Sequence, residues 1–158
     1  MANETECKNA QTAYRSLCAM LDDMQWKYTR HDEDLTITCT ARGEDLPMEI
    51  TIRVNADRQS VGLYSPIPFI VPQERRAALA VAVSAANYGM IDGNFDYDYV
   101  GGRIVFRMTS SFRDSLLSKD VFGYMLAVGC KTIDEYNDKF LIVAKSDMSY
   151  GDITKFIE

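Results

Sequence analysis

The sequence predicts an α+β fold with a mostly antiparallel sheet, a meander followed by a hairpin, in the order α-βββ-α-ββ-α. Apolar and polar residues alternate repeatedly between residues 26 and 67, as they do in the half-buried strands of a meander. An uncharged helical segment follows over 77–88 and leads into two further alternating segments around a glycine pair. Strands that are grouped along the chain, with helices at the joints, are typical of α+β domains.

The first element is expected to be a helix over about residues 5–25. Asn3 followed by Glu6 matches a capping box, in which each side chain accepts a hydrogen bond from the backbone N–H of the other residue. The apolar residues that recur at helical spacing are Ala10, Ala13, Tyr14, Leu17, Leu21 and Met24. We expect this face to be buried.

Four strands are expected in the next part of the chain, over residues 26–30, 35–41, 48–54 and 61–67. Polar turns separate them, and His31–Asp34 is the first of these turns. Threonines alternate with apolar residues in the second strand, which is the pattern of a sheet with one solvated face. Pro66 and Pro68 end the fourth strand, which the pattern leaves open as one strand or two pieces.

The central helix is expected to begin at Pro72, because a proline at the first helical position loses no hydrogen bond. One apolar face consists of Leu79, Ala82, Val83 and Ala86, and a second consists of Ala77, Val81, Ala85 and Tyr88. A helix that is apolar on two faces is expected to be covered on more than one side. Gly89 is expected to end the helix in a left-handed C-cap.

A hairpin is expected after Gly93. Aromatic residues alternate with polar ones in its first strand, over residues 94–99, and Gly101-Gly102 is expected to form the turn with positive φ. The return strand is expected over 103–108, and a connection from Met108 to Leu117.

The C-terminal part is expected to form a long helix and a short one. Ser118 is a suitable N-cap for the long helix, and Ser149 for the short one. Gly129 weakens the long helix, and Thr132 with Glu135 has the spacing of a second capping box. A continuous helix and a helix that breaks near Gly129 therefore both stay open.

Length and charge restrict the class of protein. A chain of 158 residues is most simply one domain, 1–158, which needs no disulfide or metal to hold a core. The net charge of −6, with Arg75-Arg76 as the one basic pair, argues against nucleic acid as a partner. The N-terminus is polar and no apolar run reaches the roughly 20 residues of a membrane span, so we expect a cytoplasmic protein with no membrane partner.

No catalytic residue and no cofactor are expected from the sequence. The four cysteines, which include no CxxC pair, are expected to be reduced thiols, with Cys18 and Cys39 on buried faces. Gly101-Gly102 lacks the context of a phosphate-binding loop. With His31 as the single histidine, no Ser-His-Asp or Cys-His arrangement can be proposed.

Two acidic segments have some features of metal sites, and the expected fold explains both without a metal. His31–Asp34 is best read as a solvated turn, because four consecutive turn residues rarely converge on one ion. The alternate acidic residues of 92–98 have the spacing of a calcium loop. However, Tyr97 and Arg103 occupy the positions at which such a loop needs Gly and Glu, and strand alternation already accounts for the spacing.

The second apolar face of the central helix has two explanations. In one, the long C-terminal helix covers it within the chain. In the other, Ala77, Val81, Ala85 and Tyr88 meet a second copy of the chain or another protein. The sequence leaves both explanations open.

The region from Asn87 to Arg107 carries a motif with family specificity. Asn87 is followed by Gly93-x-Phe95-x-Tyr97-Asp98 and then by Gly102-x-Ile104-x-Phe106-Arg107. This arrangement resembles the YbjN-like family of bacterial sensory transduction regulators, in which a helix ending in Asn leads to a G-x-F strand, a glycine turn and a strand with an aromatic-Arg end. The C-terminal apolar helix fits the family as well, whereas the turn from Tyr99 to Gly102 is longer here.

The resemblance implies a fold like that of type III secretion chaperones, which are small, acidic, often dimeric and not enzymes. It implies a non-catalytic interaction module that acts in regulation. It also implies that the chain forms a homodimer and binds an unidentified protein partner. One alternative is a secretion-type chaperone that binds an extended client segment. Another is a small-molecule binding domain that uses the sheet face around Tyr97 and Tyr99, which needs a pocket with convergent polar groups.

Overall fold

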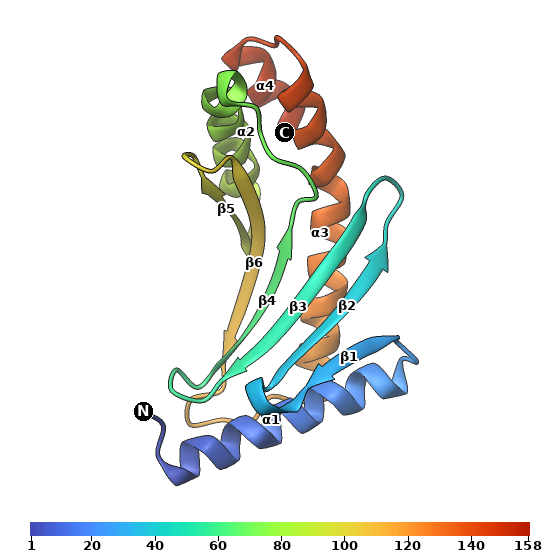
Figure 1. Cartoon of the computed structure of the whole chain (residues 1–158), viewed down its shortest axis with the longest axis vertical. Helices are drawn as coiled ribbons and strands as arrows, with labels where there is room; N and C mark the ends of the chain where they lie inside the picture. Colours follow the sequence, from blue (N-terminus) through green and yellow to red (C-terminus); the bar gives the residue numbers. More distant parts are fainter.

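A computed structural model describes residues 1–158 and shows a six-stranded antiparallel sheet with four helices (Figure 1). The helices are α1 (Glu4–Asp23), α2 (Arg76–Gly89), α3 (Lys119–Lys145) and α4 (Tyr150–Ile157). The strands are β1 (Tyr28–His31), β2 (Thr36–Arg42), β3 (Pro47–Asn55), β4 (Ser60–Pro66), β5 (Asn94–Asp98) and β6 (Arg103–Ser111). Two 3-10 segments, η1 (Asp32–Asp34) and η2 (Gln73–Arg75), precede β2 and α2. The predicted α+β class is confirmed, and the meander has all four strands that are expected before the central helix. The expected short helix follows the long one as α4.

The sheet has the strand order β1-β2-β3-β4-β6-β5, so the hairpin β5–β6 joins the meander through the β4–β6 pair. Its inner face is buried, and the large side chains include Ile37, Ile50, Ile52, Leu63, Ile104 and Phe106. Figure 1 shows α1 across one end of the sheet, and α3 running from there to α2 and α4 at the other end. The hairpin is therefore part of one continuous sheet and also lies beside α2.

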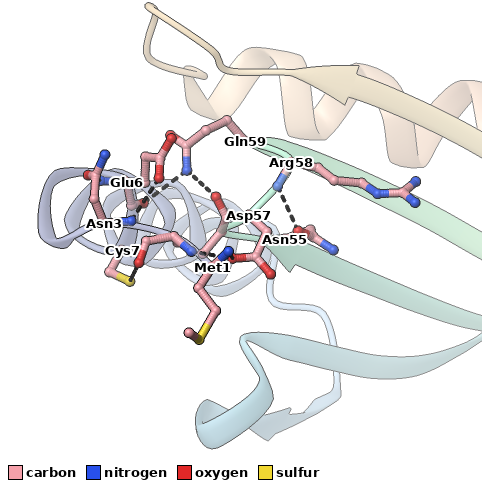
Figure 2. Close-up of polar contacts among 10 residues, drawn as sticks. Met1, Asn3, Glu6, Cys7, Asn55, Asp57, Arg58 and Gln59 are labelled. Atoms are coloured by element: carbon pink, nitrogen blue, oxygen red, sulfur yellow. Dashed lines mark hydrogen bonds and ion pairs between the residues drawn. The ribbon is translucent and has the colours of Figure 1, made fainter.

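The start of α1 is fixed to the turn between β3 and β4 (Figure 2). The predicted capping box is confirmed, because the Glu6 N–H donates to Asn3 Oδ1 at 2.9 Å and the Asn3 N–H donates to Glu6 Oε2 at 2.8 Å. Gln59, a buried residue of the turn, donates from Nε2 to the Glu6 carbonyl at 3.0 Å. Its own carbonyl accepts from the Phe112 N–H at 2.9 Å, so one residue connects α1, the turn and the end of β6.

Helix α3 is continuous, which decides between the two alternatives for the region of Gly129. Thr132 and Glu135 lie inside the helix and do not begin a new one. Gly129 is buried against the sheet, where an added Cβ would lie 3.3 Å from both terminal methyl groups of Leu63 and 3.5 Å from Phe106 Cε1. Close packing of the helix on the sheet therefore explains a glycine that helix propensity disfavours.

Several predictions of position are wrong. Strand β1 begins at Tyr28 and not at residue 26, and Met24, expected on the buried face of the first helix, is its C-cap and is 50% exposed. Helix α2 begins at Arg76, because a 3-10 turn follows Pro72. Gly89 is the last helical residue and has no positive φ, and the C-cap is Met90 in an extended conformation. Strand β6 continues to Ser111, beyond the predicted end, because β4 supplies a pairing partner over this whole length.

The N-caps of the C-terminal helices are placed as predicted. Asp152 N–H donates to Ser149 Oγ at 3.3 Å at the start of α4. Ser118 stands at the N-cap of α3, although its side chain forms no capping bond. None of the four helices combines the length and the apolar character that a membrane crossing requires.

The packing of α3 is tested by placing the same side chain at two of its glycines. Gly129→Leu forces a large side chain against Leu63 and Phe106, so we expect a loss of about 1–3 kcal/mol of unfolding free energy. Gly123 has no atom within 4 Å of an added Cβ, so Gly123→Leu is expected to gain roughly 0.5–1 kcal/mol from helix propensity. Urea unfolding of both variants measures the difference. Equal effects at the two positions would contradict the close approach at Gly129.

Candidate interaction surface

Asn87 in the last turn of α2 holds the helix to strand β5. Its Nδ2 donates to the Phe95 carbonyl at 2.9 Å, and the Phe95 N–H donates to its Oδ1 at 2.8 Å. One carboxamide therefore satisfies both backbone groups of a strand residue. These two bonds set the position of β5 relative to the end of α2.

Gly93 and Gly102 occupy positions at which a side chain would be strained. Both have positive φ, 77° at Gly93 and 70° at Gly102. An added Cβ on Gly93 would lie 2.6 Å from the Phe106 ring, and one on Gly102 would lie 2.6 Å from the Val71 carbonyl oxygen. The positive φ predicted for the hairpin turn is found at Gly102 and not at Gly101.

Arg76 at the start of α2 fixes the tip of the hairpin. Its side chain donates from Nε to the Val71 carbonyl at 3.5 Å and from Nη1 to the Val100 carbonyl. The Tyr97 hydroxyl donates in turn to the Arg76 carbonyl at 3.2 Å. The loop before α2, the helix start and the hairpin tip thus form one hydrogen-bonded unit.

The hairpin is anchored on α3 by aromatic packing. The Phe95 ring makes edge-to-face contacts with Phe106, Tyr136 and Phe140, at centroid distances of 5.3, 5.6 and 4.9 Å. Tyr136 and Phe140 belong to α3, and Phe95, Phe106 and Phe140 are fully buried. These rings belong to the core.

The alternate acidic residues of 92–98 are each engaged separately. Asp92 accepts from the Tyr124 hydroxyl at 2.5 Å. Asp96 forms a two-bond ion pair with Arg107, with Nε–Oδ2 and Nη2–Oδ1 distances of 2.7 and 3.0 Å. Asp98 Oδ1 accepts from backbone N–H groups of the hairpin turn. Their spacing thus belongs to the hairpin, as strand alternation predicts.

The residues of the second apolar face of α2, here called the α2 stripe, are Ala77, Val81, Ala85 and Tyr88. Ala77 is exposed and Tyr88 is 95% exposed, whereas Val81 and Ala85 are half-buried at the margin of the core. Helix α2 meets α3, α4 and β5, and its buried residues lie on its other face. The C-terminal helices therefore leave both ends of the stripe open to solvent.

The α2 stripe lacks charge and continues into other exposed apolar residues. No charged residue follows Arg76 within α2. Ile91, in the loop after the helix, is 96% exposed, and Val100 at the hairpin tip is 81% exposed. Exposed apolar groups that gather on one region mark interaction sites more often than single ones do. This region is the candidate interaction surface.

The predicted turn His31–Asp34 begins one residue later, because His31 is the last residue of β1 and Asp32–Asp34 form η1. Asp32 Oδ1 accepts from the Tyr14 hydroxyl at 2.8 Å and from Arg30 Nε at 3.0 Å, which ties α1 to β1. His31 Nε2 lies 3.3 Å from Thr38 Oγ1. No three His, Cys, Asp or Glu side chains come together in an arrangement that would hold a metal ion.

All four cysteines are free thiols. Cys18 and Cys39 are buried as predicted, Cys130 is half-buried and Cys7 is exposed. Burial raises the pKa of the Cys39 and Cys130 thiols to about 11. These two groups are therefore protonated at neutral pH and poor nucleophiles.

The sheet face around Tyr97 and Tyr99 does not gather free polar groups. Their rings form an edge-to-face pair at 6.2 Å, and the Tyr97 hydroxyl is already bonded to Arg76. A hollow on the sheet lies instead over β1–β3, where Thr38 and Thr51 line it. The two tyrosines thus provide side chains for packing or for contact with another surface.

Comparison with known proteins places the chain in a family. The family model YbjN, described as "Putative bacterial sensory transduction regulator", matches residues 14–141. The chain belongs to the YbjN family. No curated protein sequence matches it. The family match covers the motif from Asn87 to Arg107 and the two α3 residues, Tyr136 and Phe140, that pack on Phe95.

Solved structures with the same fold include a YbjN protein and two protein complexes, one of them a chaperone-effector complex. The crystal structure of YbjN from E. coli has a TM-score of 0.58 and 14% identity, covering 81% of this chain and 93% of that one. The ExsC-ExsE complex has a TM-score of 0.55 and 14% identity, with 79% and 90% covered. The HopA1-SchA chaperone-effector complex has a TM-score of 0.55 and 12% identity, with 81% and 95% covered. The fold of this YbjN protein is thus type III secretion chaperone-like.

The family motif is made of residues that hold α2, β5 and β6 together. Asn87 bonds to Phe95, Gly93 makes room for Phe106, and Arg107 pairs with Asp96. The resemblance identified these positions, but no sequence pattern indicates that the Asn87 side chain reaches the strand edge. The eight-residue separation of Asn87 from Phe95 has no secondary-structure period that would suggest the contact.

The Asp96–Arg107 pair is expected to make stability depend on pH. Hydrogen bonds from the Arg107 guanidinium and, to a smaller extent, from Asn94 lower the pKa of Asp96 below its ordinary value of 3.8. A carboxyl group whose pKa is lowered by folding stabilises the protein at any pH above its pKa in the unfolded state. This contribution is lost as the pH falls through its pKa in the folded state. We expect Asp96→Asn to be less stable than the wild type at pH 7, with the difference shrinking below pH 3.8. Urea unfolding at several pH values measures this.

Asp147→Asn is the matched control, because Asp147 is exposed and outside the ion pairs of the chain. A half-exposed pair contributes about 1 kcal/mol or less, so the effect at Asp96 is small. If the two variants followed the same pH curve, the ion pair would have no part in stability.

Proposed function

We propose that this YbjN protein is a non-catalytic protein-interaction module of the cytoplasm that acts in bacterial sensory or stress regulation. The observation that carries the proposal is the exposed, uncharged face of α2, which ends in Tyr88 and continues to Ile91. The family and the chaperone-like fold support binding as the activity. The separate engagement of the acidic residues argues against a hydrolytic site at the hairpin, and the raised pKa values of Cys39 and Cys130 argue against a reactive thiol at those two positions.

The partner proposed for the α2 stripe is a second copy of the chain. A two-fold interface places the same patch on both subunits, and small residues such as Ala77 and Ala85 allow two helices to approach closely. Tyr88 is the side chain with most area to bury there. Aromatic side chains at the centre of an interface commonly contribute much of its binding energy.

Light scattering on the purified protein tests the homodimer. We expect a wild-type dimer, and a monomer for Val81→Asp, because a charge in the apolar stripe must lose water on association. Val81 is half-buried, so Tyr88→Asp, at an exposed position, separates loss of association from loss of fold. Circular dichroism checks that each variant is folded.

Ala127→Asp is the matched control, because Ala127 is an exposed small residue on another helix, α3. It adds the same charge outside the stripe and is expected to leave the mass unchanged. A wild-type monomer, or a dimer that persists in both stripe variants, would show that the α2 stripe does not mediate self-association.

A second candidate function is a secretion-type chaperone that holds an extended client segment. The observation in its favour is that two of the structures with the same fold are complexes with protein partners. A client would co-purify with this protein and contain a segment protected from proteolysis in the complex. A regulator without a client would show no such segment.

A further inference from the structure

The outer edge of β5 is where the sheet ends. Strand β5 pairs with β6, and Phe95 lies opposite Phe106. Successive residues of an antiparallel strand direct their backbone groups to opposite edges. Because the N–H and C=O of Phe95 both bond to the Asn87 side chain, they point away from β6. The same alternation directs the N–H and C=O of Tyr97 outward.

We propose that Asn87 is an edge stop, whose side chain prevents β5 from pairing with the β5 strand of a second copy. An edge strand with free N–H and C=O groups is a template for pairing with another chain. The Asn87 carboxamide offers the donor and the acceptor that a strand residue would offer to Phe95. Unlike a strand, a side chain ends there and cannot continue the sheet.

The acidic residues of β5 act in the same direction. A two-fold pairing that joins Phe95 to Tyr97 of the second copy sets Asp96 opposite its own counterpart. Like charges directly opposite each other destabilise a pair of strands. Asn87 therefore blocks the edge at the Phe95 backbone, and the two Asp96 carboxylates, each paired with its own Arg107, would face each other across it. This inference holds whether or not the chain dimerises through α2.

Hydrogen exchange at the Phe95 amide tests the first step. We expect Asn87→Ala to speed this exchange by about tenfold or more, because the amide loses its acceptor. Asn94→Ala is the control, since Asn94 lies on the same strand but bonds to the Asp96 side chain. Unchanged exchange in Asn87→Ala would overturn the proposal.

Sedimentation over a range of concentrations tests the second step, with Val81→Asp as the parent so that the α2 stripe contributes as little as possible. Relative to this parent, we expect Asn87→Ala to add a concentration-dependent dimer or larger species. Adding Asp96→Asn should strengthen that association, and Asn94→Ala should add none. A fast-exchanging Phe95 amide with an unchanged mass would mean that Asn87 only stabilises the fold, which overturns the edge stop.

Asn87→Asp covers the case in which the alanine variant does not fold. An aspartate keeps an acceptor for the Phe95 N–H but loses the donor to the Phe95 carbonyl, so exchange is expected to stay slower than in Asn87→Ala. No added association is expected, because the variant also places a negative charge at the strand edge. Association of this variant beyond its parent would contradict the proposal. Whether Val81→Asp dissociates a dimer tests only the proposed function. The edge stop is tested separately, by the change in mass that the Asn87 variants cause relative to Val81→Asp.

Discussion

Phe95 packs on β6 and α3, and its position determines how the hairpin is fixed to the two neighbouring helices. Its ring packs against Phe106 in the sheet and against Tyr136 and Phe140 in the long helix. The backbone of the same residue is bonded to Asn87 of α2. Helix, edge strand, sheet and C-terminal helix therefore meet at one residue, and aromatic burial of this size contributes strongly to a core.

This arrangement has a consequence for the surface of α2. The helix is held by one face against α3 and α4, and by Asn87 and Arg76 to the hairpin. Its remaining face carries small apolar residues and ends in the exposed Tyr88. A rigid helix face presents its side chains in fixed positions, which lowers the entropy cost of binding. The proposed interaction surface is thus supported by the same contacts that hold the core.

Edge protection and surface exposure complement each other at this end of the molecule. The sheet edge at β5 has the Asn87 carboxamide on its backbone, whereas the helix next to it has an apolar face without charge. Backbone pairing between strands is tolerant of sequence, and contact between side chains is selective. A protein that prevents strand pairing at its sheet edge but exposes an apolar helix face can select its partner by side-chain shape.

Local periodicity and capping chemistry were enough to predict the α+β class, the capping box at Asn3, the one-sided strands and the two apolar faces of α2. Three features became visible only in the folded chain: the continuity of α3 through Gly129, the extension of β6 to Ser111, and the reach of Asn87 to the edge of β5. Each of these depends on a partner distant in the chain: Leu63 and Phe106 against Gly129, β4 beside β6, and Phe95 beside Asn87. Non-local contacts of this kind leave no periodic pattern in a single sequence. The sequence therefore identified the residues of the α2 stripe, but it did not decide whether they are exposed.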